Sequence, residues 1–199
     1  MALTTTAKVK TYLGISSSGD DTLIGDLIAN AQSIIESYTG RVFDVSGDTT
    51  KKFDARLDVD GRMLYFSDQL EIAAAPTTVT NGDGSTLSAD TDFVYLPRNR
   101  FPAYGLELLP SSSAWWQGDS DGNDANAISI AAKWGYSVSG SVPADIQQAC
   151  IRLTAFLYRQ RETNSDGDRP LIVDGVTILP SALPRDVTRI LSPYIMRAY

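Results

Sequence analysis

The stretch Asp20–Gly40, DDTLIGDLIANAQSIIESYTG, decides the fold of this chain. Asp20 or Asp21 can cap the first turn of a helix, and Gly40 can adopt the left-handed conformation that commonly closes one. A helix of this length is only marginally stable alone in water, so its apolar face needs packing partners elsewhere in the chain. The apolar residues recur at steps of three and four, which predicts one helical face made of Leu23, Ile24, Leu27, Ile28, Ala31, Ile34, Ile35 and Tyr38.

The composition is that of a globular protein. The chain has 199 residues, of which 43% are hydrophobic and 21% are charged. No apolar run is long enough to cross a bilayer, and the sequence turns polar directly after Leu3, so we expect neither a membrane span nor a signal peptide. The single cysteine, Cys150, falls within an apolar helical pattern, which favours a buried structural thiol over a nucleophile.

The sequence contains no histidine. The commonest metal ligand and the usual general base at neutral pH are therefore both missing, and we predict no enzyme, no catalytic residue, no metal site and no cofactor. The segment Asp119–Asp124, DSDGND, resembles a calcium loop, but the sixth and twelfth positions hold Asp124 and Ile130 where an EF-hand requires Gly and Glu. We interpret it as a solvated turn.

The net charge of −7 is concentrated in the middle of the chain. Residues 41–142 carry fourteen acidic and eight basic side chains, whereas residues 143–199 carry six acidic and seven basic ones. Tight binding of duplex DNA requires a basic surface that releases counterions. An acidic surface repels phosphates instead, which suits the passage of DNA and excludes tight or sequence-specific binding.

The periodicity changes twice along the chain. Residues 41–142 contain short alternating runs separated by turn residues, which predicts a β-rich barrel or sandwich. Helical patterns precede and follow this segment, and a hairpin signal, Asp174-Gly175, lies between the last two helices. We therefore predict an α+β fold: a core of four helices from residues 1–40 and 143–199, with a β-rich insertion at 41–142 between helices 2 and 3.

The helical patterns also predict which residues lie in the core or at an interface. In the first helix we expect Val9, Tyr12 and Leu13 to point inward. Across the helices, the residues expected in the core or at an interface are Leu27, Ile34, Tyr38, Arg41, Ile146, Leu153, Tyr158, Ile190, Leu191 and Tyr194.

Three further features predict contacts with partners. Arg98 and Arg100 alternate with aromatic residues, as on surfaces that bind single strands, but their acidic surroundings favour a contact with a neighbouring subunit. Trp115 and Trp116 point to opposite faces of an extended segment, so one is free for a subunit contact or a sugar. The hairpin that carries Ile172 and Ile178 needs an apolar surface to pack on.

Four segments, in this order, resemble the phage head–tail connector, or adaptor, family: VKTYLGI (Val9–Ile15), DDTLIGDLIANAQSIIESYTGR (Asp20–Arg41), PADIQQACIRLTAFLYRQRE (Pro143–Glu162) and LPRDVTRILSPY (Leu183–Tyr194). The resemblance implies a ring, typically a dodecamer, that docks on the portal protein in the virion neck and extends the DNA channel. It also implies a next connector (stopper) or tail protein as partner, assembly in the host cytoplasm, no membrane and no catalysis. Residues 41–142 match no motif of the small, mostly helical members of the family.

Two other classes of function stay open at this point. The first is a β-type binding module on a phage particle, for example for glycan, in which Trp115 or Trp116 would contact the ligand. The second is a carboxylate enzyme such as a glycosidase, although no pair of acids can be placed from the sequence.

Overall fold

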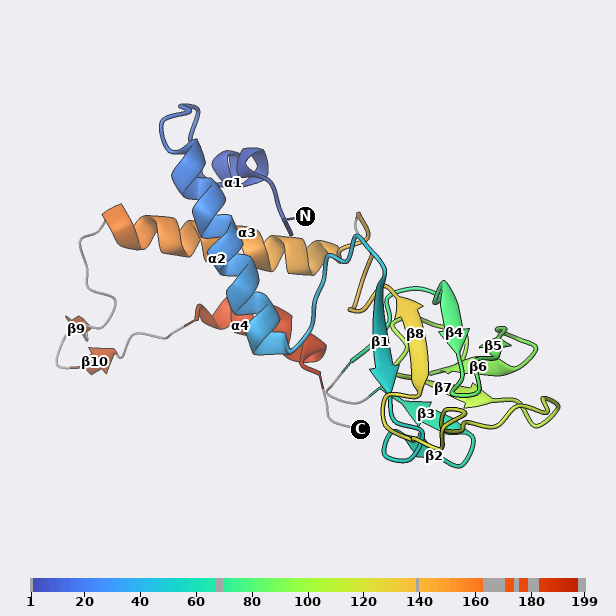
Figure 1. Cartoon of the computed structure of the whole chain (residues 1–199). Helices are drawn as coiled ribbons and strands as arrows, with labels where there is room; N and C mark the ends of the chain where they lie inside the picture. The colour runs from blue at the N-terminus through green and yellow to red at the C-terminus, as the bar shows by residue number, and fades with distance from the viewer. Residues whose placement is uncertain are drawn as a thin grey trace. The chain divides into compact units, whose positions relative to one another are not determined.

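A computed structural model describes residues 2–66, 70–138, 140–162, 171–173, 176–178 and 183–196. The chain is divided into two compact units, and we call them the helical unit (Ala2–Arg41 with Val142–Met196) and the β unit (Val42–Ser141). Helices and antiparallel sheets both contribute, so the fold is α+β, as predicted (Figure 1). No helix among the described residues is long and apolar enough to cross a membrane.

The described part of the helical unit contains four α-helices and one short 3-10 helix: α1 (Thr6–Leu13), α2 (Asp21–Thr39), α3 (Ala144–Glu162), α4 (Arg185–Leu191) and η1 (Ser192–Tyr194). Helix α2 crosses α3, while α1 and α4 contact both of them (Figure 1). Gly40 closes α2 with a φ of +68°, and its N–H donates to the carbonyl of Glu36. Asp20 occupies the N-cap position, but its side chain makes no capping hydrogen bond.

The buried stripe of α2 is narrower than the sequence predicted. Its buried apolar residues are Ile24, Ile28, Ala31 and Ile35, and Thr39 joins them because its hydroxyl donates to the carbonyl of Ile35. The other apolar residues of the predicted face are partly exposed: Leu23, Leu27, Ile34 and Tyr38. Only one sector of the helix is therefore covered by its own chain.

The partners of this stripe come from α3 and α4. The apolar side chains there with no exposed surface are Ile146, Ala149, Cys150, Leu153, Val187 and Leu191. Burial raises the pKa of the Cys150 thiol to about 11, so the thiol is neutral at physiological pH. This agrees with the buried structural cysteine that the sequence predicts. In α1, Val9 is buried as expected, but Tyr12 is 45% exposed because it points away from the core.

The described part of the β unit contains eight strands: β1 (Thr49–Phe53), β2 (Val59–Asp60), β3 (Met63–Tyr65), β4 (Thr78–Thr80), β5 (Thr86–Leu87), β6 (Phe93–Leu96), β7 (Gly105–Leu108) and β8 (Ile128–Ala132). They form two antiparallel sheets, with strand orders β1-β8-β4-β5 and β2-β3-β7-β6. Ile72 bridges to Ala103 and to Trp134.

One hydrophobic core joins the two sheets of the β unit. Alternate residues of β8 are buried, and they pack in the same cluster as Leu64, Leu106 and Leu108 of the other sheet. Three aromatic rings, those of Phe53, Phe66 and Trp134, lie 5.1–5.6 Å apart between centroids within this cluster. The β unit thus has two antiparallel sheets around one core, as in a sandwich, which is one of the two architectures that the turn spacing predicted.

The predicted hairpin is present as β9 (Leu171–Val173) and β10 (Val176–Ile178), which pair antiparallel with Val173 opposite Val176. The turn Asp174-Gly175, the side chains of Ile172 and Ile178 and the loop at 163–170 lie outside the described residues.

Candidate functional site

Two hydrogen bonds fix the ends of α2 within the helical unit. At the start, the Tyr158 hydroxyl on α3 donates to Asp20 Oδ2 at 2.8 Å. At the end, Arg41 Nε donates to the carbonyl of Tyr194 in η1 at 2.6 Å. The Tyr194 hydroxyl in turn donates to Asp145 Oδ2 at 2.7 Å, which links η1 to the start of α3. Three residues that the sequence nominated, Tyr158, Arg41 and Tyr194, thus make polar contacts between helices.

The remaining nominated residues of the helical unit fall into two groups. Ile146, Leu153 and Leu191 are fully buried and belong to the core. The partly exposed ones are Leu27, Ile34, Tyr38 and Ile190, of which Tyr38 is 37% exposed. We call Leu23, Leu27, Ile34 and Tyr38 the α2 flank. It is an apolar strip on the surface of α2, next to the buried stripe.

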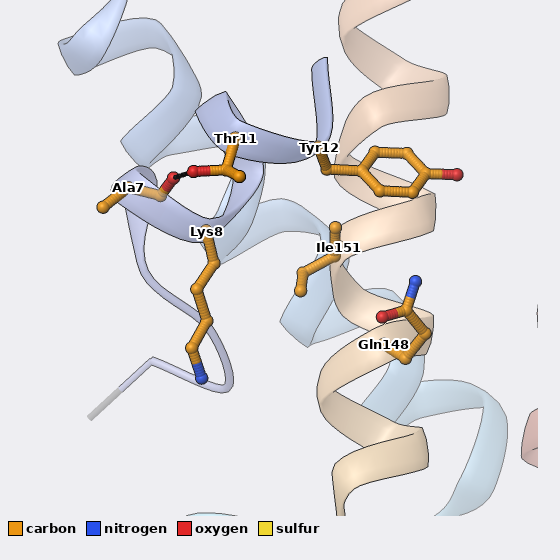
Figure 2. A pocket seen from close by; sticks show the side chains of 6 residues that line it. All are labelled: Ala7, Lys8, Thr11, Tyr12, Gln148 and Ile151. Carbon is orange, nitrogen blue, oxygen red and sulfur yellow. Dashed lines mark hydrogen bonds between the residues drawn. The ribbon is translucent and has the colours of Figure 1, made fainter. Parts of the chain in front are cut away.

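A groove lies between α1 and α3, with a volume of about 400 Å³. Its lining residues are Ala7, Lys8, Thr11, Tyr12, Gln148 and Ile151. Figure 2 shows the Tyr12 ring extending from α1 alongside α3, with Ile151 between the two helices. The Thr11 hydroxyl donates to the carbonyl of Ala7, and Lys8 Nζ donates to Gln147 Oε1 at 2.9 Å. We call this surface the α1–α3 groove; the sequence did not predict it, because Tyr12 fits an inward helical position.

The two adjacent tryptophans of the β unit have opposite environments. Trp116 is 8% exposed, and its indole N–H donates to the carbonyl of Arg62 at 3.0 Å. Trp115 is 57% exposed, and the Arg62 guanidinium lies 4.5 Å from its ring centroid. Arg62 also donates to the carbonyls of Leu108 and Ser112, so this arginine holds the segment in place. Sequence reasoning missed Arg62, because an arginine after a turn glycine carries no signal of its own.

The surroundings of Trp115 do not favour a sugar site. One face of its ring is occupied by Arg62. The nearby amide of Asn81 is also engaged, because its Nδ2 donates to the Trp115 carbonyl while its Oδ1 accepts the backbone N–H of Gln117. Glycan sites usually present several polar groups that are free to converge on the ligand.

The nominated arginines of the β unit lie beyond the end of β6. Arg98 Nη2 pairs with Glu107 Oε2 on β7 at 2.8 Å, although its side chain is 61% exposed. Arg100 is exposed. The nearby aromatic rings of Tyr95 and Phe101 lie against each other, 5.0 Å between centroids. Stacking on nucleic-acid bases needs free ring faces and unpaired cations, so this arrangement fits a protein contact better.

Several carboxylates of the acidic segment have structural roles. Asp58 Oδ2 accepts the N–H of Asp54, and Asp54 Oδ1 accepts the N–H of Asn126. In the DSDGND loop, Asp119 accepts the backbone N–H groups of Asp121 and Asn123, and these hydrogen bonds, led by those from Asn123, lower its pKa. Its carboxylate therefore stabilises the turn itself. Among the described residues, no group of three or more Cys, Asp or Glu is placed to hold a metal ion.

Comparisons with known proteins indicate a family and related folds for this chain. Residues 4–85 match the family model described as phage gp6-like head–tail connector protein. A search of curated proteins finds no match. Two solved structures share the fold, and their titles are "Neck of empty GTA particle computed with C6 symmetry" and "Neck of native GTA particle computed with C12 symmetry".

The first of these matches has a TM-score of 0.57 and 18% identity, and covers 98% of this chain and 90% of that chain. The second match has a TM-score of 0.54 and 17% identity, and it covers 97% of this chain and 88% of that chain. Both therefore span the helical and the β unit, although the sequence segments suggested that residues 41–142 depart from the family. The family model also extends into the β unit, to residue 85, and leaves the two C-terminal segments outside its range. Over residues 4–85, the resemblance of this chain to the phage gp6-like head–tail connector family is confirmed.

Proposed function

We propose that the chain is a structural subunit of the neck of a tailed phage or phage-like particle, where it joins head to tail. One combined observation carries the proposal. Residues 4–85 match a head–tail connector family, and two chains from particle necks share the fold over nearly the whole length of both partners. The proposal assigns the chain no reaction and no cofactor.

Within this function the two units have different roles. The four helices of residues 1–40 and 143–199 form the connector core, and residues 41–142 are an insertion between helices 2 and 3. The hydrogen bonds Tyr158–Asp20 and Arg41–Tyr194 support a core that holds its helices in fixed positions. The β unit has its own hydrophobic cluster, so it can present surface loops without disturbing the helical core.

The ring is the second element of the proposal. Copies of the chain close into a dodecamer that docks on the portal protein and offers a platform to the next connector or a tail protein. The related neck structures were computed with sixfold and twelvefold symmetry, and both symmetries are compatible with twelve subunits. Assembly takes place in the host cytoplasm, before the ring is part of the virion.

The charge distribution suggests how DNA passes this ring. Fourteen acidic side chains in residues 41–142 would keep phosphates from adhering if part of the β unit faces the channel. Asp54 and Asp58 accept hydrogen bonds from backbone N–H groups, so neutralising them would disturb the fold. Asp60, which is exposed, is therefore a better position for testing this effect on the rate of DNA ejection.

The hairpin β9–β10 is proposed to reach a neighbouring subunit or the portal. A two-stranded hairpin is barely stable alone, so it requires a surface to pack on. Deleting residues 171–179 should abolish assembly and leave the helical far-UV signal intact. Assembly that survives this deletion would contradict the role of the hairpin while leaving the connector function in place.

The function is tested by a cryo-EM reconstruction of the neck of the parent particle. We expect the chain to fit a ring of density between the portal and the tail. Particles that lack the chain should accumulate as filled heads and free tails that do not join. Density for the chain outside the neck, or normal joining without it, would overturn the proposal.

A further inference from the structure

The helical unit carries two partly exposed apolar surfaces on opposite sides of α2. Two side chains of α2 make polar contacts with α1 and the segment before it: Asp21 pairs with Lys10 at 2.6 Å, and Gln32 accepts the N–H of Leu3. At about 100° per residue, these two positions lie about 140° around the helix from the centre of the α2 flank. The buried stripe lies between them. The α1–α3 groove and the α2 flank are thus separated by the core.

Contacts at the two ends of α2 show which elements lie near them. Asp20, directly before α2, accepts a hydrogen bond from Tyr158 near the end of α3, and Arg41, directly after Gly40, donates to the carbonyl of Tyr194 in η1. Gln147, which accepts the hydrogen bond of Lys8, lies near the start of α3. Helix α3 therefore crosses α2 with its first turns beside α1 and its last turns near the start of α2; the crossing is seen in Figure 1.

From this arrangement we infer that neighbouring subunits of the ring meet through these two surfaces, with the α2 flank of one copy seated in the α1–α3 groove of the next. The inference rests on the proposed function, because it assumes that the chain forms a ring. A cyclic oligomer with more than two subunits needs a heterologous contact, in which two different surfaces on each subunit meet. An apolar strip on one side of a helical unit and an apolar groove on the other side meet this requirement.

Charge supports a second copy as the occupant. Lys8 lies at the edge of the groove, and Asp26 is exposed on α2 beside the flank, about 60° around the helix from Leu23. Seating the flank of one copy in the groove of the next places an acidic edge next to a basic one. A small-molecule ligand fits less well, because the polar groups in the groove are already used within the chain: Thr11 donates to Ala7, and Lys8 donates to Gln147.

Disulfide trapping tests the contact directly. The variant Tyr12→Cys/Leu27→Cys carries one cysteine in the groove and one in the flank, so oxidised rings should give a ladder of covalent oligomers on a non-reducing gel. Each single variant should stay monomeric on that gel. Tyr12→Cys/Ala29→Cys is the matched control, because Ala29 is an exposed residue of α2 about 160° around the helix from Leu27. Cys150 is fully buried and does not contribute.

A mixing experiment then tests that the contact is heterologous. Tyr12→Glu blocks the groove and Leu27→Glu blocks the flank, and each variant alone should fail to form rings. Mixed together, they should form a one-to-one complex that stops at the dimer, since one intact flank meets one intact groove. Far-UV circular dichroism checks that both variants fold, and Leu27→Met keeps an apolar flank and should still form rings.

The outcomes separate this inference from the function it rests on. Rings that form without a ladder above the control, or that form from both blocked variants, would overturn the inference and leave the ring intact. A wild-type chain that stays monomeric even with the portal protein would overturn the ring itself, and with it this contact.

Discussion

The hydrogen bond between Tyr158 and Asp20 gives the sharpest test of how the helical unit is held together. Tyr158 is 6% exposed, and its hydroxyl donates to Asp20 Oδ2 at 2.8 Å, across the crossing of α3 and α2. Tyr158→Phe removes this hydroxyl and keeps the ring, so no cavity of any size is created. The substitution therefore isolates the hydrogen bond from the packing.

The expected cost follows from the type of bond. A hydrogen bond to a charged group contributes about 1.5–3 kcal/mol net to the free energy of unfolding. Asp20 is only half-buried, so water can replace part of the lost bond and the expected loss lies near the lower end, about 1–2 kcal/mol. With an m-value of about 2 kcal/mol/M in urea, the unfolding midpoint should fall by about 0.5–1 M.

The assay uses two probes, because the two units differ in composition. All three tryptophans lie in the β unit, so their fluorescence reports that unit, whereas circular dichroism at 222 nm reports mainly the helices. We expect Tyr158→Phe to shift the 222 nm transition. Tyr12→Phe is the matched control, because Tyr12 is exposed and its hydroxyl makes no hydrogen bond to another residue that the structure describes, so the midpoint should not move.

A double-mutant cycle with Asp20→Ala, which removes the acceptor, provides the refuting result. If the two side chains act through this bond, their coupling free energy should be about 1 kcal/mol or more. Additive effects of the two substitutions, or a loss below about 0.5 kcal/mol for Tyr158→Phe, would show that the bond does not stabilise the crossing of α2 and α3.

Three further predictions concern the β unit and the cysteine. A Cβ at Gly105 would lie 2.6 Å from the Leu64 carbonyl oxygen, so Gly105→Ala should lower the free energy of unfolding, measured with a chemical denaturant, by about 1–3 kcal/mol. Gly47→Ala is the control: a Cβ there meets open space, so the free energy of unfolding should hardly change. Hydrogen bonds from the Ser88 N–H and the Ser112 hydroxyl lower the pKa of Asp92 in the folded chain. The ionised Asp92 carboxylate therefore stabilises the folded state above its ordinary pKa of 3.8, and this stabilisation is lost as the pH falls through the lowered pKa of the folded chain. In Asp92→Asn, the free energy of unfolding should therefore fall less steeply as the pH is lowered into the acid range. The same acid dependence as in the wild type would contradict this prediction. Cys150, with a pKa of about 11, should resist alkylation by iodoacetamide in the native chain and react once the chain is unfolded in urea; rapid native labelling would contradict its burial.

The sequence was a good guide where periodicity decides the structure. The helix at Asp21–Thr39, the β-rich middle and the hairpin at 171–178 all follow from apolar spacing and turn residues. The strand order of the two sheets could not be predicted, because it depends on pairings such as β1 with β8, whose paired residues are 75 to 83 positions apart and leave no local signal.

Contacts between side chains were harder to predict than elements. Asp20 or Asp21 was expected to cap α2, but the Asp20 carboxylate makes no capping hydrogen bond and accepts one from Tyr158, which is 138 positions away in the sequence. Arg62 could not be recognised as the residue that orders Trp115, because its partners are backbone carbonyls and a ring face. Polar partners of this kind are set by tertiary packing, which one sequence does not reveal.

The width of the apolar face on α2 is where sequence and structure differ most usefully. Eight positions fit the helical pattern, but only four of them are buried in the structure: Ile24, Ile28, Ala31 and Ile35. A helix that packs on only one side does not need apolar residues outside the covered sector. Burial of a large apolar side chain contributes roughly 1.5–3 kcal/mol to stability, and Leu23, Leu27 and Ile34 lose part of this contribution because they are partly exposed to water. A second copy seated on the flank recovers that energy only in the assembled ring. The pattern of α2 is therefore consistent with two packing surfaces, one formed when the chain folds and one formed when subunits associate.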